Sequence, residues 1–416
     1  MSRATFLSWA ASLAALLLFG CASPDAIPAG VASGPSAVSD YLNVEDVVKD
    51  AENKAAEKSV ASERTNISPA NLEQLGETEP PPPPPPPPQP KIRKGDGPSA
   101  LPIFMYHQVR NDKAGDMIIS RGKLEEELAY LKREGYYSIS PGDWLDYCEG
   151  RIGLPKKCVM LTFDDGWKSQ YQNAVPLLEK YGFRGVFYVY PDFVGGSAAM
   201  NWKQIKSLAK RGHTVGCHSM THPKLTRTRG ESDRAYASRL KEEIIEAKNT
   251  IEDKTGLKIT DFCYPYGYYS EECFKLLDKA DFETATTVNA GQNSKDCDPY
   301  LLSRYQVNQS TSLSTFASWL TEPCAEASLE SPGDGGSARI QGTECRLTLS
   351  DEMLQAWRQG GEMTIRCNHE HPQFRLDGST LVFQAPRNDA HVTCAIKIKA
   401  RDGRTYRRSF FFTQGK

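Results

Sequence analysis

The chain has 416 residues, which is enough for two domains of ordinary size with additional segments. Its 50 basic and 52 acidic residues give a formal net charge of −2. This near balance provides no electrostatic basis for nucleic acid or another polyanion as the main partner. The composition therefore favours a neutral substrate.

The first 20 residues have the pattern of an export signal. Arg3 precedes a largely apolar stretch that ends in Leu18-Phe19-Gly20-Cys21. These four residues resemble a bacterial lipoprotein box, which implies lipidation of Cys21 and a membrane anchor. The alternative is ordinary cleavage and a soluble secreted protein. Because Ala22 follows the cysteine, the resemblance implies sorting to the outer membrane of a two-membrane host, facing the periplasm or the surface.

Residues 21–99 are predicted to form a disordered tether. They are rich in Ala, Ser, Glu and Pro, and nine consecutive prolines occupy positions 80–88. Polyproline is extended, so this run alone spans about 30 Å. A ligand for a proline-binding module is the alternative interpretation.

Eleven cysteines are present, and ten remain after Cys21. In an exported protein, disulfide pairing is the default expectation. Cys148 and Cys158 flank a short loop and are predicted to pair. The last four cysteines leave three pairings open: Cys324, Cys345, Cys367 and Cys394.

Between residues 100 and 325, predicted strands and helices alternate. The strands are expected at 101–107, 158–163, 185–190, 214–218, 260–264 and 282–288, and the helices at 121–134, 172–181, 202–211, 239–254 and 274–279. Repeated βα units without a Gly-rich phosphate turn predict the α/β class, with a distorted (β/α) barrel of about seven parallel strands.

Residues 330–416 have a different sequence pattern. Short alternating or apolar runs at 346–349, 363–367, 381–383, 392–398 and 406–413 are separated by turn residues. This pattern predicts a small β-sandwich-like domain, joined to the barrel through the Gly-rich segment 331–337. It either binds a glycan or a partner, or it positions the barrel.

Two adjacent carboxylates and two imidazoles carry the chemistry. Asp164 and Asp165 follow the apolar run 158–163, and His218 and His222 lie four residues apart. Because successive side chains on a strand point in different directions, the two aspartates can have different tasks. One can complete a His/His/Asp metal set while the other remains free as a base, so the pattern predicts hydrolysis. Cys217 is a conceivable thiolate ligand, but the strand neighbour of a ligand normally points away from it.

Three motifs resemble the polysaccharide deacetylases, the nodulation-type enzymes of carbohydrate esterase family four. They are residues 162–166, 218–223 and 264–267, in the order of that family. The resemblance implies that Asp165, His218 and His222 hold a divalent metal ion and that Asp164 is the general base. Zinc is the first expectation, with cobalt, nickel and manganese as alternatives. The resemblance also implies that the backbone amide of Tyr266 donates to the oxyanion and that Pro265 shapes the loop.

Two departures from the family pattern point to one branch. Cys263 stands where many members have an arginine that orients the base, and no histidine lies between His222 and His369 to form the late Leu-x-His motif. The branch of poly-N-acetylglucosamine deacetylases resembles this chain in lacking that arginine and in its opening Tyr106-His107. The resemblance implies that His107 is the general acid, and a structural histidine at a strand end is the alternative.

Other polar and aromatic residues give weaker signals. Five aromatic residues near the motifs could form sugar-stacking walls or belong to the core: Trp167, Tyr190, Trp202, Tyr266 and Tyr268. Only Tyr266 is predicted to face the sugar. His369-Glu-His371 is read as a polar turn rather than a metal site.

Taken together, the sequence predicts a metal-dependent hydrolase that removes N-acetyl groups from an N-acetylhexosamine polysaccharide of the cell envelope or an exopolysaccharide. One alternative is an O-acetyl esterase on acetylated glycans. The other is a glycan-binding pseudoenzyme, against which the complete set of Asp164, Asp165, His218 and His222 argues.

Overall fold

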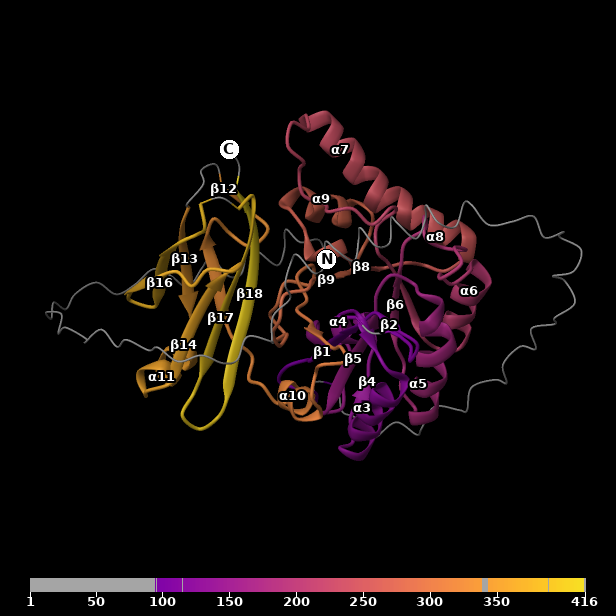
Figure 1. Ribbon diagram of the computed structural model, residues 1–416, viewed down its shortest axis with the longest axis horizontal. Helices are drawn as coiled ribbons and strands as arrows, with labels where there is room; N and C mark the ends of the chain where they lie inside the picture. Colours follow the sequence, from indigo (N-terminus) through magenta and orange to yellow (C-terminus); the bar gives the residue numbers. More distant parts are fainter. Residues whose placement is uncertain (1–93, 95, 114, 339–342, 388, 415–416) are drawn as a thin grey trace, which may run out of the picture. The chain divides into compact units, whose positions relative to one another are not determined.

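The computed structural model describes residues 94–414 except 95, 114, 339–342 and 388 (Figure 1). These residues all belong to one compact unit of the chain. The predicted signal peptide 1–20, Cys21 and most of the predicted tether lie outside the described residues. Within the described part, no helix is long and apolar enough to cross a membrane.

A parallel sheet forms the barrel. Its strand order is β10-β1-β5-β6-β7-β8-β9, and β4 pairs with β5 beside this path. The strands are β1 (Ile103–Tyr106), β4 (Tyr137–Ser138), β5 (Cys158–Phe163), β6 (Val186–Val189), β7 (Thr214–Cys217), β8 (Asp261–Cys263), β9 (Thr284–Thr286) and β10 (Tyr305–Gln306). The path has two ends, so the predicted barrel of about seven parallel strands is confirmed as a curled sheet with an open seam.

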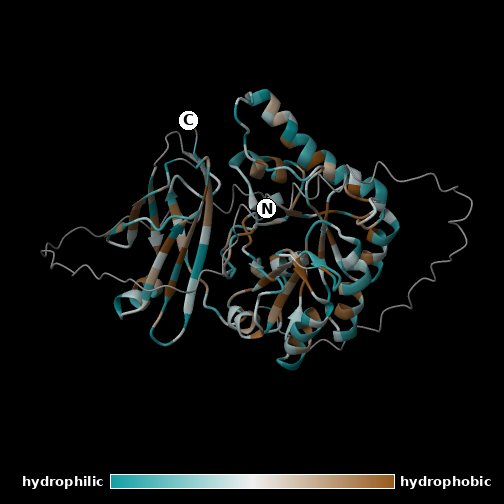
Figure 2. Ribbon diagram, in the orientation of Figure 1, coloured by the Kyte–Doolittle hydropathy of each residue, from teal (hydrophilic) through white to brown (hydrophobic). Residues whose placement is uncertain are grey.

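Continuous apolar runs explain the central strands. All six residues of β5 are buried, as are all four of β1 and of β6. A parallel sheet that is covered on both faces selects such runs rather than alternation. Figure 2 shows hydrophobic residues on the strands of the barrel and more polar residues on the helices around them. A small parallel pair, β2 (Gln108–Val109) with β3 (Ile118–Ile119), follows β1.

Helices and short helical turns flank the parallel sheet (Figure 1). They are α3 (Arg121–Arg133), α4 (Pro141–Cys148), η2 (Gln170–Ala174), α5 (Val175–Tyr181), α6 (Trp202–Lys210), α7 (Asp233–Lys241), η3 (Glu242–Glu246), α8 (Ala247–Thr255), η4 (Pro265–Gly267), α9 (Glu271–Lys279) and α10 (Leu313–Trp319). Capping fixes several starts. Ser120 accepts from the Lys123 amide before α3, and Ser140 forms a capping box with Asp143 before α4.

The C-terminal β-domain, defined here as residues 327–414, has two four-stranded sheets. Their orders are β11-β13-β16-β15 and β12-β18-β17-β14, with antiparallel pairing everywhere except between β12 and β18. The strands are β11 (Ala327–Ser331), β12 (Ser337–Ala338), β13 (Glu344–Leu349), β14 (Glu362–Cys367), β15 (Phe374–Asp377), β16 (Thr380–Gln384), β17 (His391–Lys399) and β18 (Thr405–Gln414). The predicted sandwich-like fold is confirmed. Helix α11 (Asp351–Arg358), capped by Ser350, was not predicted.

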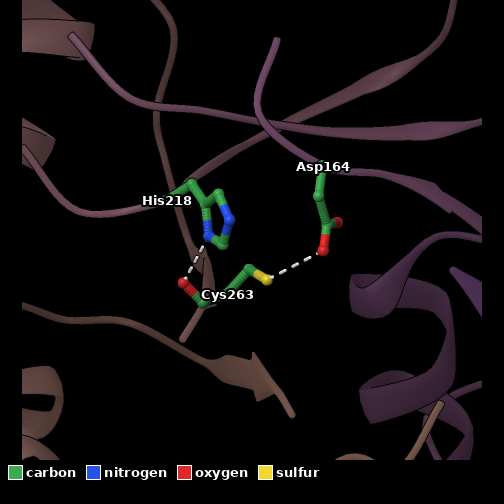
Figure 3. Close-up of side chains that lie close together, drawn as sticks. All are labelled: Asp164, His218 and Cys263. Atoms are coloured by element: carbon green, nitrogen blue, oxygen red, sulfur yellow. Dashed lines mark hydrogen bonds between the residues drawn. The ribbon is translucent and has the colours of Figure 1, made fainter. Parts of the chain in front are cut away.

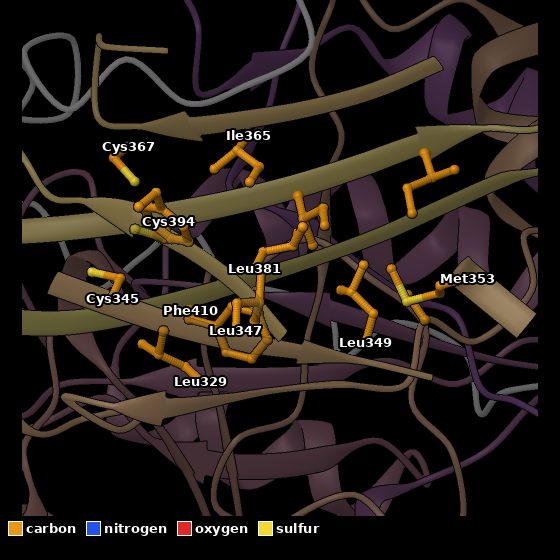
Figure 4. Close-up of a cluster of buried hydrophobic side chains, with 14 of the residues drawn as sticks. Leu329, Cys345, Leu347, Leu349, Met353, Ile365, Cys367, Leu381, Cys394 and Phe410 are labelled. Atoms are coloured by element: carbon orange, nitrogen blue, oxygen red, sulfur yellow. The ribbon is translucent and has the colours of Figure 1, made fainter. Parts of the chain in front are cut away.

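A single apolar cluster fills the β-domain (Figure 4). Leu347 and Leu381 face each other in the register of β13 and β16, and both are buried. Ile365 and Ile396 form the corresponding pair between β14 and β17. Both sheets therefore contribute a buried face to one core, as a sandwich requires.

The predicted cysteine pairing is wrong in the structure. All ten cysteines of the described residues are free thiols. Cys158 begins β5, and its Sγ donates to the Pro155 carbonyl at 2.9 Å rather than bonding to Cys148 at the end of α4. Burial raises the pKa of the Cys158 thiol to about 12, so this side chain packs as a neutral group.

Candidate active site

Asp164 and Asp165 lie at the carboxyl end of β5. The Asp164 amide donates to the Tyr106 carbonyl at 2.9 Å, which extends the pairing of β1 with β5 by one residue. The chain then turns, with φ of 78° at Asp165 and 82° at Gly166. A Cβ at Gly166 would lie 3.1 Å from Val189 Cγ1, so glycine allows both the turn and the close approach of β6.

His218 and His222 are held on the loop after β7. The His218 amide donates to the Val189 carbonyl, and the His222 amide donates to Ser219 Oγ at 3.0 Å. Between them, the Glu243 carboxylate of η3 accepts hydrogen bonds from the amides of residues 220 and 221 at 3.0 and 2.9 Å. The sequence analysis did not identify Glu243, which fixes the spacing of the two histidines.

The three predicted ligands converge on one point. Asp165 Oδ1 lies 3.6 Å from His218 Nε2 and 3.3 Å from His222 Nε2, and the two nitrogens are 3.1 Å apart. A tetrahedral zinc ion with bonds near 2.1 Å needs donors about 3.4 Å apart. The donor set therefore fits a divalent ion, and the three residues form one of two ligand-like groups in the described part of the chain.

Neighbouring groups orient these donors. His218 Nδ1 lies 2.8 Å from the Cys263 carbonyl and donates its proton there. The lone pair of His218 Nε2 is therefore available to a metal ion beside Asp165 and His222. Trp167 Nε1 donates to Asp165 Oδ2 at 2.7 Å, which leaves Oδ1 facing the histidines. Trp167, weighed above as a sugar-stacking residue, is only 5% exposed and instead aims a predicted ligand.

Arg304 holds Asp164. Its guanidinium is fully buried and contacts the carboxylate through two parallel hydrogen bonds, 2.7 Å to Oδ1 and 2.8 Å to Oδ2. Arg304 Nη1 also donates to Thr162 Oγ1, and Nε donates to the Thr287 carbonyl. Burial, the largest single influence, raises the pKa of Asp164, but the Arg304 charge and hydrogen bonds together with the nearby histidines lower it by more, so the pKa lies below its ordinary value.

Arg304 replaces the arginine that the sequence lacks at position 263. Its Nη2 donates to Cys263 Sγ at 3.1 Å, so the thiol occupies the expected position beside a guanidinium that comes from another segment. Sequence reasoning missed this residue. The available signal was a lone cation in the apolar stretch 301–305, just before β10.

Asp164, His218 and Cys263 form the second ligand-like group (Figure 3). Figure 3 shows Cys263 between the other two side chains, with its Sγ 3.5 Å from Asp164 Oδ2. The Arg304 guanidinium already contacts both Asp164 and Cys263, and a second cation there would be repelled. The set with Asp165 is therefore the better metal site.

His107 directly follows β1, as Asp164 follows β5. Tyr106 and Phe163 are partners in the parallel register, so the next residues on both strands lie at the same edge of the sheet. The electrostatic influence of His107 on Asp164 lowers the pKa of that carboxyl further. The structure thus brings His107 to the site, and its role as general acid remains a prediction.

The third motif forms a tight turn beside the histidines. Pro265 is buried and begins η4, and Tyr266 has φ of 56° and ψ of 9°. The Tyr266 ring lies edge-on to His222 with centroids 4.6 Å apart. This places the predicted oxyanion donor next to the ligand set, although its hydrogen bond to substrate remains a prediction.

Left-handed backbone concentrates at the site. Six non-glycine residues of the described chain have positive φ, and four lie in the three motifs: Asp165, Ser219, His222 and Tyr266. Each costs on the order of 1–3 kcal/mol and persists only where surrounding contacts impose it. Such clusters are typical of functional sites, and here they mark the same residues as the chemistry.

The other aromatic candidates have different places. Tyr190 is buried, stacks on Phe193 and lies 5.0 Å from the His222 ring. Tyr268 is also buried, whereas Trp202 begins α6 and is half-buried. Tyr190 and Tyr268 are therefore packing residues, and the predicted sugar contact of Tyr266 remains untested.

Cys217 and the His369-Glu-His371 segment contribute no ligand set. Neither belongs to a group of three donor residues in the described part of the chain. Cys217 is buried, and burial raises the pKa of its thiol above its ordinary range. His369 is exposed, which agrees with a polar turn.

Comparisons with known proteins point to the family that the three motifs resemble. Residues 151–285 match the family model for polysaccharide deacetylase. The protein YxkH of Bacillus subtilis (strain 168), a polysaccharide deacetylase by name, is 27% identical over 227 residues, or 55% of this chain and 78% of that protein. The poly-beta-1,6-N-acetyl-D-glucosamine N-deacetylase of Escherichia coli (strain K12) is 22% identical over 251 residues, covering 51% of this chain and only 37% of that protein.

A solved structure of IcaB from Ammonifex degensii is similar over 54% of this chain and 99% of its own, with 28% identity and a TM-score of 0.48. The sequence likenesses support a hydrolase, which agrees with the chemistry of the paired carboxylates and histidines. Within that class, residues 151–285 match polysaccharide deacetylase, the family that the three motifs resemble.

Proposed function

We propose that the protein is a metal-dependent N-deacetylase of an N-acetylhexosamine polysaccharide. The observation that carries this proposal is the division of the two aspartates. Asp165 faces the donor set with His218 and His222, whereas Asp164 is held by Arg304 outside it. A binding module has no need of an ionised carboxylate beside a complete ligand set.

The residues divide the reaction between them. Asp164 takes the proton of the attacking water, and its depressed pKa keeps it ionised for that step. A divalent ion held by Asp165, His218 and His222 supplies Lewis acidity at the acetyl carbonyl when bound. The Tyr266 amide donates to the developing oxyanion. His107, at the end of the neighbouring strand β1, delivers a proton to the leaving amine.

The substrate class rests on the relatives. The Escherichia coli relative and one from Staphylococcus aureus, 21% identical over 230 residues, are both named as poly-beta-1,6-N-acetyl-D-glucosamine N-deacetylases. We therefore propose a polymer of N-acetylglucosamine, in the envelope or an exopolysaccharide, with zinc as the first metal to test. An O-acetyl esterase would use the same residues, because esters are cleaved more easily than amides.

The cellular place is proposed from the sequence. Lipidation of Cys21 and the proline-rich tether would hold the barrel away from an outer-membrane anchor, facing the periplasm or the surface. This arrangement suits a polymeric substrate that cannot enter the cytoplasm. Metabolic labelling with a radioactive fatty acid, compared between the natural chain and Cys21→Ala, tests the anchor, and equal labelling would refute it.

Acetate release decides the function. The full chain, loaded with zinc or cobalt, is incubated with β-1,6-linked N-acetylglucosamine oligomers and separately with acetylxylan, and Asp164→Asn is the control. Acetate from the oligomers that disappears in the variant supports the N-deacetylase. Acetate from acetylxylan alone makes the protein an esterase, and tight oligomer binding without release makes it a pseudoenzyme.

A further inference from the structure

The β-domain contacts the loop that follows His222. Thr226 Oγ1 lies 2.9 Å from His391 Nε2 on β17, in a hydrogen bond between the barrel and the β-domain. Lys224 Nζ lies 4.6 Å from the centroid of the Tyr268 ring, and that ring packs edge-on against His391 at 4.9 Å. Burial, then the Lys224 charge, lower the pKa of His391 to about 4, so the imidazole is neutral near pH 7.

The same domain contacts the loop that follows Tyr266. Phe411 of β18 lies 5.1 Å from the Tyr268 ring and 5.2 Å from the Tyr269 ring. Tyr269 Oη donates to Asp334 Oδ1 at 2.6 Å, and the same oxygen accepts the Phe411 amide at 2.9 Å. The segment directly after the third motif is thus joined to β18 by ring contacts and by a shared carboxylate.

A third set of contacts surrounds Arg304. Arg408 Nη1 donates to Ser303 Oγ at 3.3 Å, on one side of Arg304. On the other side, Tyr305 Oη donates to Glu322 Oε2 at 2.8 Å, and Arg407 Nη2 donates to Oε1 of the same carboxylate at 3.1 Å. Both sequence neighbours of Arg304 are therefore tied, directly or through Glu322, to β18.

These contacts fall where the site needs support. His222 and Tyr266 have left-handed backbone, which persists only under external constraint. Glu243 constrains the chain between His218 and His222, and the β-domain constrains the segments after His222 and after Tyr266. A strained loop that is anchored on one flank alone could relax toward an ordinary conformation and misplace its side chains.

We propose that the β-domain is a positioning element of the deacetylase site, with His391 and Phe411 as its principal positioning residues. This inference rests on the proposed function and assigns the role left open for residues 330–416. The contact surfaces are covered, with Tyr268 and Phe411 only 6% and 3% exposed. They therefore serve the barrel rather than a glycan.

Substitutions at the two residues test the proposal in the full chain. His391→Ala and Phe411→Ala should each lower kcat for acetate release about ten- to hundredfold, since small displacements of catalytic groups have effects of this size. KM should stay within about twofold because neither side chain is proposed to touch substrate. His391→Gln, which keeps a polar group near Nε2, should restore most of kcat. His369→Ala, an exposed histidine of the same domain, should match the natural chain.

A second measurement covers variants that fold poorly. Thr226→Val removes the barrel side of the hydrogen bond with little change in shape, and its effect on kcat should not add to that of His391→Ala. Additive effects, or an unchanged kcat in His391→Ala and Phe411→Ala, would overturn the proposal.

Amide hydrogen exchange separates this proposal from the proposed function. Exchange in residues 219–226 and 264–269 should accelerate at least several-fold in His391→Ala and Phe411→Ala, relative to His369→Ala. If the natural chain releases no acetate, the proposed function fails, but faster exchange in these loops would still support the positioning role. Unchanged exchange would refute it whether or not the chain is active.

Discussion

Two regions of the barrel bury a carboxylate, and they treat it in opposite ways. At the rim, where the carboxyl ends of the barrel strands lie, Asp164 contacts the Arg304 guanidinium, and the pKa of Asp164 lies below its ordinary value. Behind β1, Glu127 of α3 accepts a hydrogen bond from Tyr106 Oη at 2.9 Å, and the Lys123 charge lowers its pKa by less than burial raises it. Burial raises the pKa of Glu127 to about 8. Burial is common to both, so the direct two-point contact with a guanidinium distinguishes the ionised Asp164 from the neutral Glu127.

Asp164→Asn should have the largest effect on the rim. The amide keeps the shape but cannot accept a proton, so kcat should fall by a factor of about 10² to 10⁴. Zinc affinity, measured by calorimetric titration, should stay within about threefold because the donor set does not include this residue. Unchanged turnover would show that another group is the base.

Arg304→Met should remove the distinction between the two regions. It would leave the Asp164 carboxylate buried without its partner, which costs about 3–5 kcal/mol of unfolding free energy in urea titrations. Arg375→Met, at an exposed arginine of the β-domain, is the matched control and should change stability by less than about 0.5 kcal/mol. Adding Asp164→Asn to Arg304→Met should recover part of the loss, and a further additive loss would contradict the pairing.

Trp167→Phe should weaken the metal site without disturbing the base. The change removes the hydrogen bond from Nε1 to Asp165 Oδ2 and keeps most of the buried ring. Loss of such an outer partner lowers metal affinity about 10- to 100-fold. Competition with a chelator measures the affinity. An affinity equal to that of the natural chain would mean that Asp165 is oriented by other contacts.

The smallest expected effect is the change in unfolding free energy per unit of pH that Glu127 causes. Its folded pKa of about 8 lies above the ordinary value of 4.5, so the folded state binds the proton more tightly. Its contribution is present in full below pH 4.5 and is lost as the pH rises toward 8, at no more than about 1.4 kcal/mol per unit. Asp164 contributes in the opposite direction, and its part is lost only in acid. In urea titrations from pH 5 to pH 8, Glu127→Gln should flatten this decline, and an unchanged slope would refute the assignment.

Much of the rim could be predicted because its signals are local. A strand of buried residues ends directly before Asp164, and the spacing of His218 and His222 follows from one short loop. What escaped prediction depends on contacts between distant segments. Arg304 and Asp164 are 140 residues apart, and Glu243 reaches the histidine loop from another helix. No periodicity encodes such pairs.

Other differences have equally specific causes. The sequence of α11 is amphipathic and starts after a serine cap, yet it is only eight residues long and lies among strands, so the strand pattern dominated the interpretation. The cysteine prediction relied on the oxidising compartment implied by the N-terminus rather than on geometry. The placement of a thiol depends on the strand that carries it, as Cys158 at the start of β5 illustrates.

The distance in sequence between Arg304 and Asp164 has a consequence for dissecting the protein into modules. The segment that matches the family, residues 151–285, contains the donor set but neither His107 nor Arg304. A transplant cut at those borders would carry Asp164 without its counter-charge and β5 without either β1 or β10. During synthesis, the same dependence delays assembly of the charged site until nearly three quarters of the chain has been made. The smallest transferable unit is therefore set by ion pairing rather than by the extent of sequence likeness.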